Sequence, residues 1–251
     1  MNPLVLAYDG FDPPDEGLRE ALCTLSNGYF ATRGAAPEAD ADAVHYPGTY
    51  VAGCYNRLVS RVAGREVENE DLVNAPNWLP LTVRPQGGRW LDLGAQELLA
   101  YRQELDLRRG VLTRRLRVRD PDGRVTGLTQ RRFVSMDDPH LAGLETTVVA
   151  ENWSGPLEVR SALAGRVVNA GVERYRALDG RHLEPVETGQ TGDDLVWLQA
   201  QTRSSVIRID QAATTRVVRD GQVVSVARRT EQEPGYVAQH LVLEVREGEP
   251  V

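Results

Sequence analysis

The chain has 251 residues, and its 29 basic residues, all arginine, face 36 acidic ones, which gives a formal net charge of −7. This acidic balance argues against a protein that binds nucleic acid or anionic lipid, because both interactions need a basic surface. A hydrophobic content of 41% with 26% charged residues is typical of a globular chain and excludes a disordered one.

The N-terminal segment shows no targeting signal. Residues 1–9 lack a basic region, and the apolar run at residues 4–7 is too short for a signal peptide. No segment approaches the roughly 20 apolar residues of a membrane span. Cys23 and Cys54 form no CxxC motif, which argues against zinc and favours two reduced thiols over a disulfide. We therefore expect a soluble, cytoplasmic protein.

Helical patterning is weak and lies near the N-terminus. In residues 15–25, Leu18, Leu22 and Leu25 have helical spacing and predict a short helical turn. Residues 35–47 are small, acidic and bounded by proline, so we expect a solvated loop there. No other segment sustains a helical period over three turns.

The rest of the chain has the periodicity of strands. In residues 112–119 apolar side chains alternate with Arg115, Arg117 and Arg119, and Arg114 breaks the pattern. Alternation also occurs in residues 206–210 and 237–245, where Gln239 interrupts the apolar face.

Asp-Gly pairs separate several of these strand-like segments. They occur at residues 122–123 and 220–221, and residues 179–180 are a third candidate. This dipeptide tolerates the positive φ that a tight hairpin requires. Short strands joined by tight turns predict an all-β fold, an antiparallel sandwich or barrel. No boundary divides the chain, so residues 1–251 are expected to form a single domain.

Common catalytic and cofactor motifs are missing. The sequence has no phosphate loop, dinucleotide fingerprint, zinc-peptidase helix, serine-hydrolase elbow or calcium loop. Its four histidines lack metal-ligand spacing and are expected to be structural: His45, His140, His182 and His240. Acidic residues at 66–71 and 137–138 are interpreted as solvated loop charges rather than paired catalytic carboxylates. We therefore expect no metal and no catalytic residue.

Several linked motifs concentrate in residues 20–114. Asn27-Gly28-Tyr29 is followed by Arg33-Gly34 and Glu38. Three longer segments come next: residues 47–56 (PGTYVAGCYN), 72–81 (LVNAPNWLPL) and 105–114 (LDLRRGVLTR). Later matches are Ser135, residues 151–155, residues 159–166 and Asn169.

The order of these motifs resembles the N-terminal domain of glycoside hydrolase family 65, the maltose, trehalose and kojibiose phosphorylases and their hydrolase relatives. The resemblance extends from about Glu16 to the C-terminus. Ala75 departs from the pattern, because a bulky apolar residue is expected before Pro76, and only a small packing change should follow.

The resemblance implies a large antiparallel β-sandwich, similar to the galactose-mutarotase supersandwich. In the family this domain precedes an (α/α)6 barrel that carries the general-acid glutamate and the phosphate site. Phosphate or water there attacks the anomeric carbon of an α-glucosidic disaccharide with inversion. Because the barrel is absent, we expect this chain to be one domain of a longer enzyme and inactive alone.

The resemblance also implies roles for particular residues. Residues 47–81 are the candidate face toward the barrel, with Tyr50, Asn77 and Trp78 at the rim of the cleft. The alternative is that Tyr50 and Trp78 fill the sandwich core.

The first motif is interpreted as structural. Asn27-Gly28 and Arg33-Gly34 are turn or bulge points, and Arg33 is expected to pair with Glu20 or Glu38. The implied partners are the disaccharide, the catalytic barrel and a second copy in a homodimer. Inorganic phosphate is the co-substrate if the parent is a phosphorylase, and no other cofactor is implied.

Three other functions fit the same sequence. A freestanding carbohydrate-binding module would need exposed aromatic residues, and aromatics are only 6% of the chain. A mutarotase-like epimerase would need convergent histidines with a carboxylate. A structural dimerisation domain, like a scaffold, would expose an apolar patch.

Overall fold

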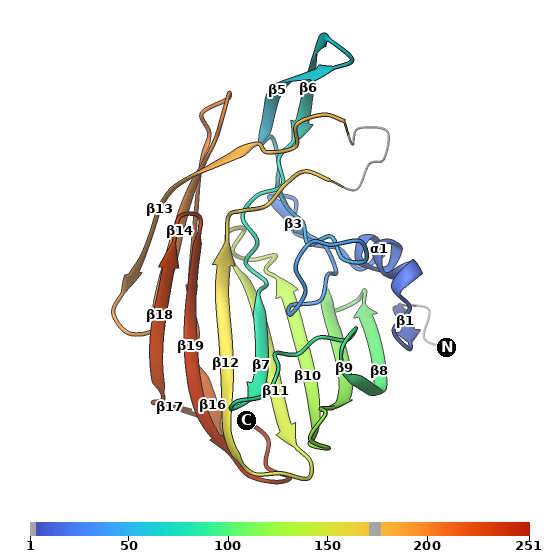
Figure 1. Ribbon diagram of the computed structural model, residues 1–251, viewed down its shortest axis with the longest axis vertical. Helices are drawn as coiled ribbons and strands as arrows, with labels where there is room; N and C mark the ends of the chain where they lie inside the picture. The colour runs from blue at the N-terminus through green and yellow to red at the C-terminus, as the bar shows by residue number, and fades with distance from the viewer. Residues whose placement is uncertain (1–3, 171–176) are drawn as a thin grey trace.

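The computed structural model describes residues 4–170 and 177–251. Within these ranges there is one α-helix, α1 (Pro13–Leu22), and every strand pairing is antiparallel. The all-β fold predicted from the alternating pattern is confirmed (Figure 1).

A five-stranded sheet forms one side of the sandwich. Its strands are, in spatial order, β1 (Val5–Asp9), β8 (Glu97–Asp106), β9 (Val111–Arg119), β10 (Val125–Val134) and β11 (Ala142–Ala150). β9 contains the alternation read from the sequence, and the predicted Asp122-Gly123 turn joins it to β10 with Gly123 at φ +83°.

A four-stranded sheet packs against it. Its order is β18 (Ala227–Glu233), β19 (Tyr236–Val245), β12 (Gly155–Ala164) and β7 (Leu81–Pro85). The largest apolar core lies between the two sheets, with Leu116 and Leu128 from one and Leu157 and Leu241 from the other. This two-layer packing buries the apolar faces that the period of two predicts.

A second core lies under a three-stranded sheet made of β13 (Leu183–Thr191), β14 (Leu195–Thr202) and β15 (Arg208–Thr214). Leu198 of this sheet packs with Leu163 of β12 and Val237 of β19. Cys54 is buried in this core, whereas Cys23 is buried in a third one, and both thiols are free.

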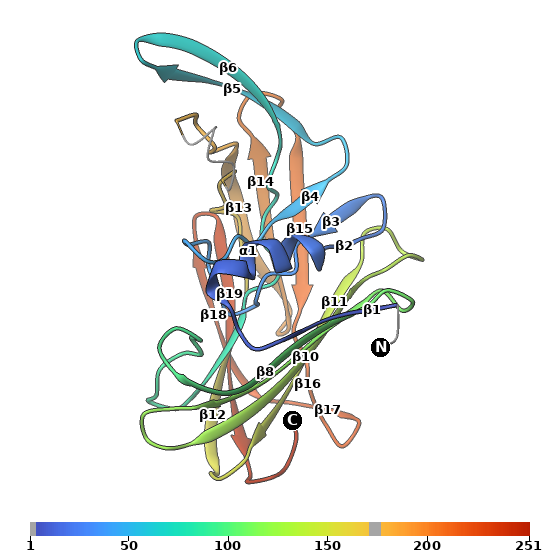
Figure 2. The same cartoon turned by 90° about the vertical axis from the view of Figure 1, so that its right-hand side faces the viewer.

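Five short strands and a longer hairpin complete the fold. They are β2 (Leu25–Ser26), β3 (Phe30–Thr32), β4 (Thr49–Val51), and the pair β16 (Val217–Arg219) and β17 (Gln222–Val224), which the predicted Asp220-Gly221 turn connects. The hairpin of β5 (Tyr55–Val62) and β6 (Arg65–Leu72) projects from the body of the molecule in both views (Figures 1 and 2).

Helix α1 lies across the end of the five-stranded sheet (Figure 2). It begins and ends two to three residues earlier than the helical turn predicted for residues 15–25, and its orientation is the reverse of what the leucine spacing implies. Leu18 and Leu22 are 61% and 51% exposed, whereas Glu16 and Glu20 are 3% and 1% exposed. Glu20 finds its partners in the neighbouring loop, at His45 and Tyr46, and Glu16 pairs with Arg19 of its own helix at 3.2 Å.

Three local predictions were wrong. The loop at residues 35–47 is irregular as expected but solvated only in part, since residues 40–43 are exposed whereas Ala35 and His45 are buried. Asp179-Gly180 forms no hairpin; it lies in the connection between β12 and β13, where Gly180 packs on the Asn169 backbone. The acidic residues 66–71 lie in strand β6 rather than in a loop.

Candidate functional site

Arg33 ties the first sequence motif to helix α1. Its Nη2 lies 3.5 Å from Oε2 of Glu20 and donates to the Gly17 carbonyl oxygen at 2.9 Å. Its Nε donates to the Tyr46 carbonyl oxygen at 2.9 Å. From the sequence, Glu20 and Glu38 are both possible partners of Arg33. In the structure Arg33 pairs with Glu20, and Glu38 pairs with another arginine. The pair therefore holds the helix to the loop.

Glu20 is the centre of this network. One carboxylate oxygen accepts from Nδ1 of His45 and the other from the Tyr46 amide, each at 2.9 Å. Burial by itself would lower the pKa of His45, but the hydrogen bond and charge of Glu20, with Asp42 and Glu16, outweigh burial and raise it. Burial also raises the pKa of Glu16. No pattern in the sequence indicates that these glutamates are buried.

Asn27 fastens its turn to a distant loop. Its Oδ1 accepts from the backbone amides two and three residues later, at 3.0 and 3.1 Å, and Gly28 supplies the positive φ of +88°. Its Nδ2 donates to the carbonyl oxygens of Ser135 and Pro139 at 2.7 and 3.0 Å. Asn27-Gly28 therefore forms the predicted turn, and Asn27 also connects this turn to Ser135, 108 residues later in the sequence.

Gly34 is a point of close approach. A Cβ atom there would lie 2.6 Å from Cβ of Cys23, and the Gly34 amide donates to the Glu20 carbonyl oxygen at 2.7 Å. The residue is needed because the strand-to-loop segment passes directly against the end of α1, and not because of a positive φ.

Asn77 and Trp78 lie against the second core. The Asn77 backbone exchanges two hydrogen bonds with Ala164 at 2.7 and 2.9 Å, and its side chain is buried. Trp78 packs on the same core, and its buried Nε1 has no hydrogen-bond partner among the described residues. This environment favours a packing role for both side chains, and a contact with sugar stays a prediction.

Tyr50 lies on β4, beside the segment that carries Asn77. Its hydroxyl donates to the Tyr46 hydroxyl at 3.3 Å, and burial raises the pKa of Tyr50. The two segments meet where the Ala75 amide donates to the Thr49 carbonyl oxygen at 2.7 Å. The structure thus brings the three candidate rim residues into one region of the fold, although each has separate partners.

Asn74 and Asn169 join three loops and were not singled out as a pair from the sequence. Asn74 is buried, and its Oδ1 accepts from the Thr49 amide at 3.0 Å. The Asn74 amide donates to Oδ1 of Asn169 at 2.8 Å, and Nδ2 of Asn169 donates to the Leu72 carbonyl oxygen at 2.8 Å. The pair therefore fixes the loops around Trp78.

A row of polar side chains crosses the inner face of the five-stranded sheet. Gln103, Arg114 and Gln130 are directly opposite one another on β8, β9 and β10, and all three are buried. Arg114 forms a two-point ion pair with Glu38, with one contact at 2.7 Å. In the sequence, this buried polar row is indicated only by Arg114, which interrupts the alternation of apolar residues in 112–119.

His182 occupies a separate buried network at the base of the β5–β6 hairpin. Nδ2 of Asn56 donates to its Nδ1 at 3.0 Å, and its Nε2 lies 3.2 Å from Oδ2 of Asp71. Burial lowers the pKa of His182, while Asp71 partly opposes the shift. His140 instead contacts Tyr29, so the predicted structural roles fit the partners of these histidines.

His240 also has its own partner, Glu231, at 2.7 Å. Because these histidines lie on different elements with different partners, the described residues do not show the convergent histidine pair of an epimerase.

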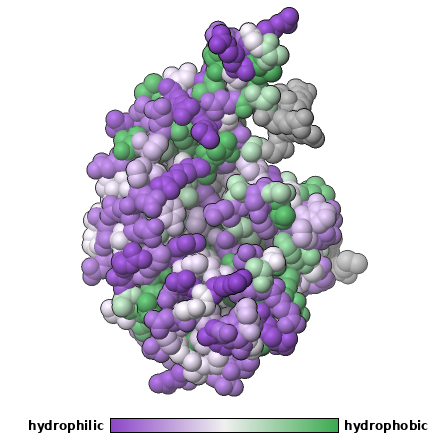
Figure 3. Space-filling model, in the orientation of Figure 1, coloured by the Kyte–Doolittle hydropathy of each residue, from purple (hydrophilic) through white to green (hydrophobic). Residues whose placement is uncertain are grey.

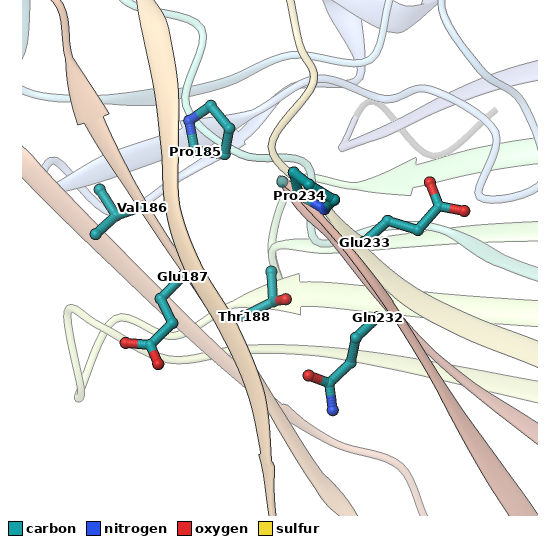
Figure 4. A pocket seen from close by; sticks show the side chains of 8 residues that line it. Pro185, Val186, Glu187, Thr188, Gln232, Glu233 and Pro234 are labelled. Carbon is teal, nitrogen blue, oxygen red and sulfur yellow. The ribbon is translucent and has the colours of Figure 1, made fainter.

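An open hollow of about 360 Å³ lies between β13 and the β18–β19 turn (Figure 4). It contains two carboxylates, Glu187 and Glu233, whose side chains point away from each other. Glu233 is held by Nη2 of Arg166 at 2.7 Å. The hollow therefore lacks the facing carboxylate pair that glycoside hydrolysis uses.

Within residues 4–170 and 177–251, no group of three or more histidine, cysteine or acidic side chains is arranged to hold a metal ion. In the same ranges, α1 is too short and too polar to cross a membrane. The side chains described above connect segments of the fold to one another.

Comparisons with known proteins agree with this geometry. Residues 6–251 match the model of the glycosyl hydrolase family 65, N-terminal domain. An uncharacterized glycosyl hydrolase of Mycobacterium tuberculosis is 50% identical over 228 residues, which cover 91% of this chain and 17% of the relative. The chain therefore spans about a sixth of the length of this relative.

Two phosphorylases are more distant relatives. A kojibiose phosphorylase of Caldanaerobacter subterraneus is 31% identical over 80% of this chain and 24% of its own length. A trehalose 6-phosphate phosphorylase of Lactococcus lactis is 33% identical over 79% of this chain and 25% of its own length.

A solved structure supports the fold. A protein assigned as a kojibiose phosphorylase from the human microbiome superposes with a TM-score of 0.84 at 16% identity, over 100% of this chain and 31% of that one. The chain therefore belongs to glycosyl hydrolase family 65 and corresponds to the N-terminal domain of that family.

Proposed function

We propose that residues 1–251 form a single non-catalytic domain of a longer family 65 enzyme, which cleaves an α-glucosidic disaccharide with inversion by phosphate or water. The match of residues 6–251 to the N-terminal family domain carries this proposal. The arrangement of the ionisable groups supports it, because the buried carboxylates Glu20 and Glu38 are paired with basic side chains of the fold.

Within the longer enzyme, the domain acts as a scaffold for the catalytic barrel and the dimer. Two features support this role. Leu18 and Leu22 of α1 are exposed although their helix has a buried side. On the β5–β6 hairpin, Tyr55 and Val59 are 49% and 60% exposed. A two-stranded hairpin is marginally stable in water, so a covering partner would stabilise it.

These contact surfaces differ in part from the face predicted from residues 47–81. In that region the segment around Asn77 is buried, whereas the hairpin is the exposed part. The face shown in Figure 3 is mostly hydrophilic, with hydrophobic residues in scattered small areas. We therefore assign the contacts to α1 and the hairpin rather than to a broad apolar patch.

An activity assay on the isolated chain tests the non-catalytic role. Kojibiose, trehalose or maltose is incubated with phosphate, and glucose 1-phosphate is measured, with a kojibiose phosphorylase as positive control. We expect no release above background from this chain. Release at a rate near that of the control would overturn the proposal.

The scaffold role is tested in the longer protein. Replacing Leu18 and Leu22 by glutamine keeps helix propensity but removes the apolar surface. We expect a lower thermal stability and activity of the longer enzyme, with unchanged stability of the isolated domain. Val242→Thr, at a residue 40% exposed on β19, is the matched control. Equal effects of both changes would contradict the assignment of α1.

A further inference from the structure

A buried histidine joins the base of the projecting β5–β6 hairpin to the three-stranded sheet. Asn56 and Asp71 are directly opposite each other in the hairpin, one residue from its open end. His182, which immediately precedes β13 and is 1% exposed, contacts both of them. Its Nδ1 lies 3.0 Å from Nδ2 of Asn56, and its Nε2 lies 3.2 Å from Oδ2 of Asp71. Because the hairpin forms a sheet of its own, these contacts fasten it to the body of the molecule.

The hydrogen bonds of Asn56 determine which ring nitrogen of His182 carries the proton. Oδ1 of Asn56 accepts from the backbone amides of Ser204 and Ser205, each at 2.9 Å. Its Nδ2 can only donate, so Nδ1 of His182 is the acceptor. The proton of the neutral ring is then on Nε2, where Asp71 accepts it. The neutral form therefore satisfies both partners in the hairpin.

Protonation of His182 places two donors against each other. The imidazolium carries a proton on both nitrogens, so Nδ1–H would point at the N–H group of Asn56. Asn56 cannot reverse its amide without turning an N–H group toward the amides of Ser204 and Ser205. Opposed buried donors are costly, so the ring must leave its position or Asn56 must leave the β14–β15 turn. Either movement detaches the base of the hairpin from the sheet.

The charged groups around the ring come from three parts of the chain. Burial is the largest effect and lowers the pKa of His182, whereas Asp71 of β6 and Asp179 of the β12–β13 connection oppose the shift. Arg203 of the β14–β15 turn lowers the pKa further, and it also lies 3.6 Å from Glu184. The side chain of Asp71 is 31% exposed, so water screens part of its charge. The ring is therefore neutral near pH 7 and gains its proton on acidification.

We propose that His182 is a pH-operated latch: the neutral ring holds the β5–β6 hairpin on the three-stranded sheet, and the protonated ring releases it while the sandwich stays folded. The change at the switch is one proton, and the two-state element is the attachment of the hairpin. In the longer enzyme, release loosens the contact made by Tyr55 and Val59. This last consequence rests on the proposed scaffold role, but release in the isolated chain does not.

Hydrogen exchange of the full chain at pH 8 and pH 5.5, corrected for the intrinsic exchange rates, tests the latch. We expect the protection of the amides in residues 55–72 to fall about tenfold at pH 5.5, as for the loss of about one buried hydrogen bond. The amides of β8 and β9 should keep their protection. Equal protection of the hairpin at both pH values, or an equal fall in β8 and β9, would overturn the proposal.

Matched variants identify the group that titrates. His182→Gln keeps an acceptor and a donor in a neutral side chain and should remove the dependence of hairpin protection on pH. His240→Gln is the control, because His240 is a partly exposed histidine paired with Glu231, and it should retain the dependence. If His182→Gln does not fold, Asn56→Asp offers an acceptor to the protonated ring and should keep the hairpin protected at pH 5.5.

A fall in protection that persists in His182→Gln or in Asn56→Asp would overturn the latch. These measurements use the isolated chain, so their outcome is independent of the scaffold role, which the α1 variants of the longer enzyme test.

Discussion

Arg114 and Glu38, 76 residues apart in sequence, meet in a two-point ion pair whose side chains are 5% and 3% exposed. The contact holds the loop at residues 35–47 against the inner face of the five-stranded sheet. It explains why the side chain of Glu38 is buried in an otherwise partly exposed acidic loop and why one arginine interrupts an apolar strand face.

Removing the carboxylate charge of Glu38 should be strongly destabilising. Glu38→Gln leaves Arg114 buried without its counter-charge, for which we expect a loss of about 3–5 kcal/mol in unfolding free energy. Glu145→Gln is the control, because Glu145 pairs with Arg131 at 2.7 Å while both side chains are more than half exposed. The control should lose at most about 1 kcal/mol in urea unfolding. Similar losses for the two variants would contradict the buried role.

Replacing two glycines by alanine should change the free energy of unfolding in opposite directions. Gly34→Ala places a methyl group 2.6 Å from Cβ of Cys23, so we expect a loss of about 1–3 kcal/mol from overpacking. Gly17→Ala, inside α1 with no atom near its Cβ, should gain about 0.5–1 kcal/mol. Thermal unfolding of the two variants measures both, and a neutral Gly34→Ala would disprove the close approach.

Trp78 should contribute mainly to stability. Trp78→Ala removes a large side chain from the second core, and we expect a loss of about 3 kcal/mol in the isolated chain. Trp90 is the comparison: the guanidinium groups of Arg84 and Arg160 contact its ring, 4.3 and 4.9 Å from the ring centroid, and Trp90→Ala should cost less. An unchanged stability of Trp78→Ala, together with a raised KM in the longer enzyme, would assign Trp78 to the cleft instead.

Two buried histidines should give opposite dependences of stability on pH. Folding raises the pKa of His45, so its stabilisation is fully present below the unfolded value near 6.5 and is lost as pH rises through the folded pKa. Folding lowers the pKa of His182, so its stabilisation is present above about 6.5 and is lost as pH falls through the folded pKa.

The corresponding variants test these signs. His45→Gln should lose more unfolding free energy at pH 5.5 than at pH 8, and His182→Gln should lose more at pH 8 than at pH 5.5. Urea unfolding at the two pH values measures the differences. The same pH trend in both variants would show that these histidines do not titrate as the structure implies.

The sheets could be predicted from the sequence, because strands with one buried face alternate with a period of two. Leu112 and Leu116 marked β9, and the Asp122-Gly123 pair marked its hairpin. The buried polar side chains could not be predicted, because Glu20 and Glu38 look like surface residues until their distant partners are placed. Helix α1 was misread for the same reason, since the partners of Glu16 and Glu20 determine which side is buried.

The candidate site was foreseen only in part. Asn27 and Arg33 were recognised as structural, but the sequence does not encode locally that Asn27 reaches Ser135 or that Gln103 and Gln130 flank Arg114. Those relationships depend on strand register, which pairs residues that are far apart in the chain.

The polar row across the five-stranded sheet has a consequence for the cooperativity of unfolding. It separates the large core, which contains Leu116, from the small cluster under α1, which contains Cys23 and Leu112. Because Leu105, Leu112 and Val134 of this cluster belong to the sheet, we expect only α1 and the adjoining Cys23 segment to open while the sandwich stays folded. In native-state hydrogen exchange, the amides of α1 should exchange at a lower opening free energy than those of β12 and β19.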